Sequence, residues 1–321
     1  EQGNVEVAEF TPLDSPDPAV TPDFTGNQGY LDPAPGGIDA QFSWTIPGGD
    51  GTGITIYDVE RAWQQTHEDL TAAAGVTQLL DSGDSNTQGN NDHGTAVLGE
   101  LIGDDDTKGV TGISHGADIG LAPRITTNLG NNVGNALLLA AADASPGDVI
   151  LLETQTSVCA EGGCNSTTQN GCGPSEWTQS VFDATQTAVA NRITVVAAAG
   201  NGNVDLDQED CDEKFDRTER DSGAIIVGAG GPAGSGSDRE RLAFSSYGSR
   251  VDVQGWGDGV QTTGYGDRPG RPGYEDPDDP TNPARFYTED FGGTSSASPI
   301  VAGAAANLQG IAMQMFGTPL V

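Results

Sequence analysis

The chain has 321 residues, enough to bury a sizeable core as one α/β domain. It contains 47 acidic and only 13 basic residues, for a net charge of −34. Because phosphate contacts need clustered lysine and arginine, this balance excludes nucleic acid as a partner. No run of residues is long and apolar enough to cross a membrane, so we expect no membrane partner either.

The N-terminal region is acidic and rich in proline. Residues 1–40 contain eight acidic residues, six prolines and no basic residue, and such a segment cannot fold alone. We expect either an arm on the surface or partial disorder. The chain begins at Glu1 and lacks the basic segment and the apolar segment of a signal peptide. We therefore expect the mature form of a secreted protein whose signal peptide has been removed.

The acidic, lysine-poor composition has two interpretations. It suits a saline environment, because salt screens the repulsion between like charges, and a halotolerant protein is one hypothesis. An acidic protein without any adaptation to salt fits the composition equally well.

Beyond this region, apolar strand-like runs alternate with alanine-rich helical runs. This alternation predicts a mostly parallel sheet covered by helices on both faces. The runs are residues 53–57, 136–142, 148–152, 181–190, 193–199, 224–227 and 299–315.

Polar residues stand at the ends of some of these elements. The strand-like run 53–57 is followed by Asp58, and the run 193–199 is followed by Gly200 and Asn201. His93 opens a small-residue helical stretch. Ser295 lies in Gly-Thr-Ser-Ser-Ala-Ser-Pro, at an expected helix N-terminus, where backbone N–H groups favour developing negative charge. A serine there becomes a nucleophile once a base removes its proton.

Each segment alone also has an ordinary structural interpretation. The serine-rich string resembles a flexible linker, His93 a helix start, Asp58 a turn residue, and the segment before Asn201 core followed by a turn. The occurrence of all four in one fixed order favours a catalytic site.

These four segments, in this order, resemble those of the subtilisin family of serine peptidases, the subtilases. The resemblance implies a three-layer α/β fold with a mostly parallel central sheet, formed by residues 28–321, with residues 1–27 as an extension. It also implies a secreted, extracellular, monomeric endopeptidase that acts through an acyl-enzyme. A folding propeptide or a protein inhibitor is a further expected partner.

The resemblance assigns roles to individual residues. Ser295 attacks the carbonyl, His93 is the general base and then the general acid, and Asp58 orients the imidazole. Asn201 and the backbone N–H of Ser295 form the oxyanion hole, with the Thr294 hydroxyl nearby. His67 and His115 open no comparable helix, so we expect structural roles for them.

Polypeptide substrates are expected to bind as an added strand between two backbone segments. The family commonly has Ser-Leu-Gly-Gly where this chain has Glu153-Thr154-Gln155-Thr156, so we expect a narrower or more polar pocket. The residues expected to bind substrate are Thr126, Asn128, Gly130, Glu153, Thr154, Gln155, Thr156, Ala198 and Gly200.

An acidic loop at residues 103–110 lies where subtilisins place a structural calcium ion, and oxygen-rich loops are what this hard cation requires. A run of aspartates can also simply be solvated, and Lys108 is an unusual neighbour for a cation. The ligands carried over by resemblance are the Asp69 and Asp106 carboxylates, carbonyls of Asp104, Lys108 and Val110, and the Gln28 amide oxygen.

Four cysteines allow three pairings, and their spacing fits no zinc site well. Two disulfides are expected in a secreted enzyme, and our first hypothesis pairs Cys164 with Cys172 and Cys159 with Cys211. Residues 264–290 are rich in proline, glycine and aspartate and predict a long surface loop near the rim of the active site. The alternative function is a catalytically silent, acidic, calcium-binding module of the same fold.

Overall fold

The computed structural model describes residues 20–89, 91–159, 163–165 and 167–320. Most of the expected N-terminal extension, residues 1–19, lies outside the described residues. In the described part, six strands form a central sheet in the order β10-β9-β8-β5-β1-β2, and every neighbouring pair is parallel. The strands are β1 (Thr55–Glu60), β2 (Asp118–Pro123), β5 (Val149–Leu152), β8 (Thr194–Ala198), β9 (Ile225–Gly230) and β10 (Val253–Trp256).

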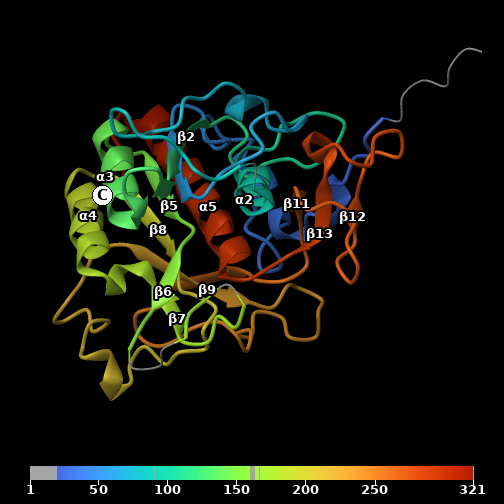
Figure 1. Cartoon of the computed structure of the whole chain (residues 1–321). Helices are drawn as coiled ribbons and strands as arrows, with labels where there is room; N and C mark the ends of the chain where they lie inside the picture. The colour runs from blue at the N-terminus through green and yellow to red at the C-terminus, as the bar shows by residue number, and fades with distance from the viewer. Residues whose placement is uncertain (1–19, 90, 160–162, 166, 321) are drawn as a thin grey trace, which may run out of the picture.

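Helices cover both faces of this sheet, which confirms the predicted three layers (Figure 1). Successive side chains of β5 explain the layering: Val149 and Leu151 pack into one core, and Ile150 and Leu152 into the other. The first core includes α2 and α5, and the second includes α3 and α4. The α-helices are α1 (Ala40–Ser43), α2 (Asp92–Ile102), α3 (Val133–Asp143), α4 (Gln179–Ala190) and α5 (Thr294–Phe316).

Short antiparallel pairs extend the edges of the molecule. The segment 264–290 is more ordered than a surface loop, because it contributes to a three-stranded sheet in the order β11-β13-β12. The remaining strands are β3 (Ile125–Thr126), β4 (Gly130–Asn131), β6 (Gln155–Ser157), β7 (Cys172–Pro174), β11 (Val260–Thr263), β12 (Gly273–Tyr274) and β13 (Tyr287–Phe291). The 3-10 helices are η1 (Thr25–Asn27), η2 (Gly29–Leu31), η3 (Thr71–Ala73), η4 (Ser175–Trp177), η5 (Glu209–Cys211) and η6 (Pro283–Arg285).

The described end of the expected extension packs on the body of the protein. The Phe24 N–H donates to the Gly109 carbonyl at 2.7 Å, and the Gly109 N–H donates to the Pro22 carbonyl at 2.8 Å. The Phe24 ring lies 5.1 Å from that of Tyr287. Residues 22–24 are therefore attached to the acidic loop 103–110. No helix in the described residues is both long and apolar enough to cross a membrane.

Candidate active site

The carboxyl ends of four neighbouring strands meet at one pocket of about 430 Å³. Glu60 is the last residue of β1, Arg124 follows β2, Glu153 follows β5, and Asn201 lies three residues beyond β8. All four line the pocket together with His93 and Ser295. Parallel strands bring such residues to one edge of the sheet, where open α/β folds bind their ligands.

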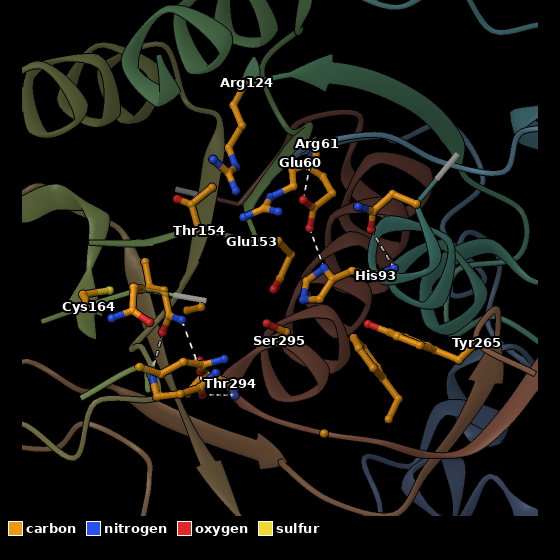
Figure 2. A pocket seen from close by; sticks show the side chains of 18 of the residues that line it. Glu60, Arg61, His93, Arg124, Glu153, Thr154, Cys164, Tyr265, Thr294 and Ser295 are labelled. Atoms are coloured by element: carbon orange, nitrogen blue, oxygen red, sulfur yellow. Dashed lines mark hydrogen bonds and ion pairs between the residues drawn. The ribbon is translucent and has the colours of Figure 1, made fainter. Parts of the chain in front are cut away.

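His93 lies in the first turn of α2, beside the end of β1. The Asn91 side chain caps this helix by accepting a 2.8 Å hydrogen bond from the His93 backbone N–H. The imidazole Nδ1 lies 2.5 Å from Glu60 Oε2 (Figure 2). The other oxygen of Glu60 accepts from the Arg61 N–H at 2.6 Å. Burial, the largest single influence, opposes ionisation of Glu60, but His93, the charge of Arg124 and the Arg61 N–H together lower the pKa of this carboxyl.

Asp58 does not have the position that the sequence predicted. It is completely buried, and its Oδ2 accepts a 2.7 Å hydrogen bond from Trp63 Nε1. Burial, with the like charge of Glu60 as a second cause, raises the pKa of Asp58 well above its ordinary value. The acid in contact with His93 is therefore Glu60, and the prediction that Asp58 orients the imidazole is wrong in this structure.

The geometry of β1 explains this difference. Side chains two residues apart point to the same face of a strand, so Asp58 and Glu60 both point toward the α2 side. They are separated by about 7 Å along the strand. His93 meets the outer of the two carboxylates, while Trp63 folds back over the inner one.

Ser295 lies in the first turn of α5, the 23-residue helix that crosses the centre of the fold. The helix starts after Gly293, whose φ of +97° favours glycine and lets the chain turn sharply into the helix. Figure 2 shows the His93 ring between Glu60 and Ser295. The structure thus brings Ser295, His93 and Glu60 together in one pocket.

Glu153 faces Ser295 from the floor of the pocket (Figure 2). It is only 5% exposed, so it does not point outward to solvent. The Ser298 hydroxyl donates to its Oε1, whereas Oε2 has no hydrogen-bond partner among the residues that the structure describes. Burial raises the pKa of Glu153 well above its ordinary value, which favours the protonated form of this carboxyl.

The amide of Asn201 is held in a fixed orientation by the start of α5. Its Oδ1 accepts from the Thr294 N–H at 2.8 Å and from the Thr294 hydroxyl at 3.0 Å. The NH₂ group is thereby left as the donor on the pocket side. The Thr294 hydroxyl, expected near the oxyanion hole, lies in the pocket wall and holds the Asn201 amide.

The structure brings some of the expected substrate-binding residues to the pocket and leaves others outside it. Glu153, Thr154, Gln155 and Ala198 line it. Four others are not among the lining residues, because they serve local structure: Thr126 and Gly130 pair in the β3-β4 hairpin, Asn128 bonds to Asp84, and Thr156 pairs with Gly173 of β7. Gly200 also lies outside, with its backbone against Cys172 and Gly173.

Several lining residues were not predicted from the sequence. Arg61, Arg124 and Asn131 lie on the wall beside Glu60, and Tyr265 and Arg271 come from the segment 264–290. The position of Arg124 directly after a buried strand was the available signal for it. The contribution of Tyr265 and Arg271 agrees with the expectation that this segment lies at the rim.

Both predicted disulfides are present. Cys164 is bonded to Cys172, and Cys159 is bonded to Cys211, which confirms the favoured pairing among the three. Cys164 lines the pocket, so the first disulfide fixes part of its rim to β7. Residues 160–162 and 166, which lie between Cys159 and Cys172 in the chain, are outside its described part.

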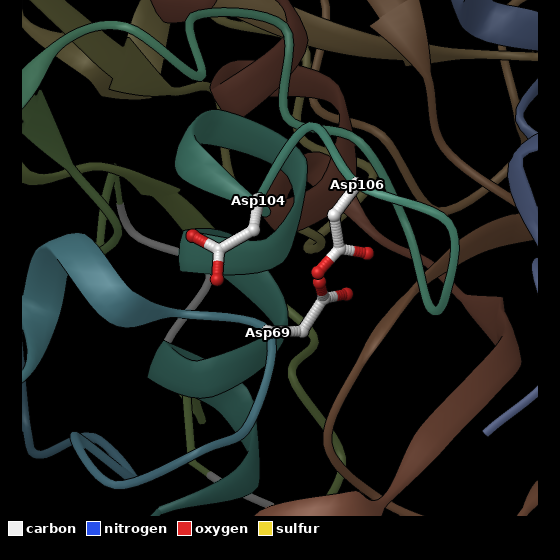
Figure 3. Close-up of side chains that lie close together, drawn as sticks. All are labelled: Asp69, Asp104 and Asp106. Carbon is white, nitrogen blue, oxygen red and sulfur yellow. The ribbon is translucent and has the colours of Figure 1, made fainter. Parts of the chain in front are cut away.

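Asp69, Asp104 and Asp106 form a second acidic group away from the pocket, with one oxygen from each within 4.8 Å of the others. Figure 3 shows the carboxylates of Asp69 and Asp106 turned toward each other. Burial raises the pKa of Asp69 to about 8, and its Oδ1 has no hydrogen-bond partner in the described part of the chain. This cluster can hold a metal ion.

Two of the other expected calcium ligands have different contacts. The Lys108 ammonium lies 3.1 Å from Asp106 and 3.9 Å from Asp69, so it points into the cluster and supplies positive charge there. The Gln28 amide oxygen accepts from the Thr111 N–H at 2.8 Å and so supports the loop. The Val110 N–H donates to Asp69 at 2.7 Å.

The two other histidines have structural contacts. His67 is buried, and its Nε2 lies 2.9 Å from the Phe286 carbonyl. Burial lowers its pKa to about 4, so it is neutral at physiological pH. His115 packs edge-on against Trp44. Neither is among the residues that line the pocket.

A parallel sheet covered on both faces, with a serine at a helix N-terminus beside an imidazole and a carboxylate, defines a serine hydrolase type of site. The sequence model of the subtilase family (Peptidase_S8) matches residues 66–318. The chain therefore belongs to the subtilase family, a family of serine peptidases. The match begins after β1, so it includes neither Asp58 nor Glu60.

Individual relatives agree with this assignment. Subtilisin DY of Bacillus licheniformis is 28% identical over 266 residues, which cover 80% of this chain and 76% of that protein. A cold-adapted subtilisin-like serine proteinase has a similar fold, with a TM-score of 0.54, 19% identity and coverage of 83% of this chain and 77% of that chain. A protease from Pseudoalteromonas arctica has a TM-score of 0.55, with 21% identity and coverage of 90% and 87%.

Proposed function

We propose that this chain is a secreted serine endopeptidase that hydrolyses polypeptides through Ser295, His93 and Glu60. The observation that supports the proposal best is the 2.5 Å contact between His93 and Glu60, in the same pocket as Ser295 and Asn201. Glu60 takes the role that the sequence assigned to Asp58. It holds the imidazole and stabilises its charged form.

Two chemical steps follow from this arrangement. The Ser295 hydroxyl oxygen attacks the substrate carbonyl carbon while its proton passes to His93 Nε2. The C–N bond then breaks as His93 gives this proton to the leaving amine, and an acyl-enzyme remains. A water molecule, deprotonated by His93, then attacks the ester carbonyl, and His93 passes this proton to the Ser295 oxygen as the C–O bond breaks and the acid is released.

The negative oxygen of the tetrahedral intermediate would lie between the Asn201 NH₂ and the Ser295 backbone N–H. Thr294 holds the amide so that only the NH₂ group is left to donate. A donor fixed before the reaction needs no reorganisation when charge develops. Glu153 adds no negative charge beside this oxygen as long as it is protonated.

Calcium is the proposed structural cofactor, held by Asp69, Asp104 and Asp106. When bound, it would neutralise the buried Asp69 and join the segment before η3 to residues 103–110. The two disulfides support an oxidising, extracellular location. A monomer that binds a propeptide or a protein inhibitor in the same pocket completes the proposal.

Covalent labelling with a fluorophosphonate tests the proposal directly. Ser295 should be labelled, and Ser295→Ala should abolish both labelling and cleavage of a denatured protein. Ser296→Ala is the matched control, although it also removes a hydrogen bond to the Trp256 carbonyl. A correctly folded chain that is neither labelled nor active would support the alternative, a silent acidic calcium-binding module.

A further inference from the structure

The wall of the pocket beside Glu60 is positively charged in an otherwise strongly acidic protein. Three of the 13 basic residues, Arg61, Arg124 and Arg271, line this pocket. Figure 2 shows the Arg61 and Arg124 side chains extending into it from the same wall, above Thr154 and Glu153. The concentration of cations here contrasts with the net charge of −34.

The guanidinium groups of Arg61 and Arg124 form no close ion pair in the described residues, although the charge of Glu60 acts on Arg124 from farther away. Within the described residues, no carboxylate lies within the 4.0 Å of an ion pair with either group. Arg124 Nη1 donates to Asn131 at 2.6 Å, but its buried Nε has no hydrogen-bond partner in the same residues. The nearby Glu60 is already engaged by His93 and by the Arg61 N–H.

The two cations also act on each other. Burial lowers the pKa of Arg124, the charge of Glu60 opposes this, and the like charge of Arg61 adds to it. A planar guanidinium presents paired N–H donors that match a carboxylate, and charge-assisted bonds of this kind are the strong ones. A bound carboxylate would relieve the repulsion and satisfy the buried Nε.

The position of this wall indicates which part of a substrate it meets. Arg61 directly follows the end of β1, and Arg124 directly follows the end of β2 and leads into β3. Asn201 follows β8, so the two arginines lie on the side of the pocket opposite Asn201. With the reacting carbonyl held at Asn201 and Ser295, the acyl part of the substrate extends along this wall. This assignment rests on the proposed peptidase function.

We propose that Arg61 and Arg124 form a subsite for an acidic side chain, aspartate or glutamate, in the residue that precedes the one attacked by Ser295. The enzyme would then prefer acidic substrate sequences, because the attraction at this subsite acts at short range. The net negative charge of the whole protein repels such substrates at long range.

Quenched peptides that carry Glu, Gln or Lys at this position, and are otherwise identical, test the proposal. We expect kcat/KM for Glu to exceed that for Gln by about 5- to 30-fold, the equivalent of one or two kcal/mol, and Lys to be the poorest. The preference should shrink in Arg61→Gln and in Arg124→Gln and vanish in the double variant. Arg192→Gln, which removes the same charge on the turn after α4, should retain it.

The fluorophosphonate labelling rate of each variant serves as the control for folding, and Arg124→Lys should keep part of the preference by keeping the charge. A labelled, active enzyme without preference for Glu, or a preference that survives in the double variant, would overturn the subsite but not the peptidase. Absence of both labelling and cleavage in the unmodified chain would instead overturn the proposed function, and the subsite with it.

Discussion

Glu60 and Asp58 end the same strand, but only Glu60 contacts His93. Glu60→Gln should therefore leave the fold intact and lower kcat by about 10,000-fold, because an amide stabilises neither the required tautomer nor the imidazolium. Asp58→Asn should change kcat by less than about tenfold, since its partner is Trp63. Steady-state kinetics on one peptide compare the two. The reverse ranking would restore Asp58 as the partner of His93.

Glu153 provides a second contrast at the scale of single residues. Because burial raises the pKa of Glu153 and favours its protonated form, Glu153→Gln should preserve both its shape and its hydrogen-bonding capacity, and kcat/KM should stay within about threefold. Glu153→Ala removes the carboxyl from the pocket floor and leaves the Ser298 hydroxyl with the Thr294 carbonyl, and it should reduce kcat/KM about tenfold or more. A large loss in the Gln variant would show that an ionised Glu153 takes part in the reaction.

Sequence alone located His93, Ser295 and Asn201 because each stands at the boundary of an element with a characteristic small-residue pattern. It assigned the contact with His93 to Asp58 instead of Glu60, because both side chains point to one face of β1 and the contact depends on how far α2 lies along the strand. Arg61 and Arg124 were missed for a related reason: their meeting depends on the neighbouring register of β1 and β2.

At the scale of elements, α2 carries a buried acid next to the active site. Glu100 is fully buried, and neither of its oxygens has a hydrogen-bond partner in the described residues. Burial, with the charge of Glu153 as a second cause, raises the pKa of Glu100 well above 4.5. The folded chain therefore keeps a proton that the unfolded chain loses, and stability falls as pH rises above the ordinary glutamate value.

Glu100→Gln removes this pH-dependent loss. Its free energy of unfolding should equal that of the unmodified chain near pH 4 and exceed it by about 1–3 kcal/mol at pH 8. Urea unfolding at the two pH values measures the difference. Glu289→Gln, an exposed position on β13, is the control and should show no such trend. A constant difference at both pH values would mean that Glu100 stays ionised.

The acidic loop after α2 gives a prediction on metal removal. Chelation should lower Tm by about 5–10 °C, since an ion that binds only the folded state at 100 times its Kd contributes about 2.7 kcal/mol. Lys108→Met should increase this shift, because the Lys108 ammonium competes for Asp69 and Asp106. Calorimetry with EDTA and then with excess calcium measures both. An unchanged Tm in both proteins would mean that no ion binds.

The disulfides and this loop show different limits of prediction from sequence. The cysteine pairing was correctly predicted, because one disulfide closes a short loop, Cys164 to Cys172, and the other closes a long one, Cys159 to Cys211. The inward direction of Lys108 was not predictable, because it depends on the Glu68 carbonyl, which accepts from the ammonium at 2.9 Å and belongs to a segment 40 residues away.

For the whole molecule, the dominant feature is the net charge of −34. Raising NaCl from 0.1 M to 1 M shortens the Debye length from about 10 Å to about 3 Å. Repulsion among the carboxylates should weaken, and Tm should rise by several degrees in a calorimetric titration. A falling Tm would mean that ion pairs such as Arg285 with Asp276 and Glu68 outweigh the repulsion.

The helix that begins at Thr294 also packs against β8, β9 and β10. During translation, Glu60, His93 and Asn201 all leave the ribosome before Ser295. A nascent chain therefore has no nucleophile until α5, which completes one layer of the core, is synthesised. A copy of the chain that ends before Ser295 therefore lacks the group that the proposed reaction requires.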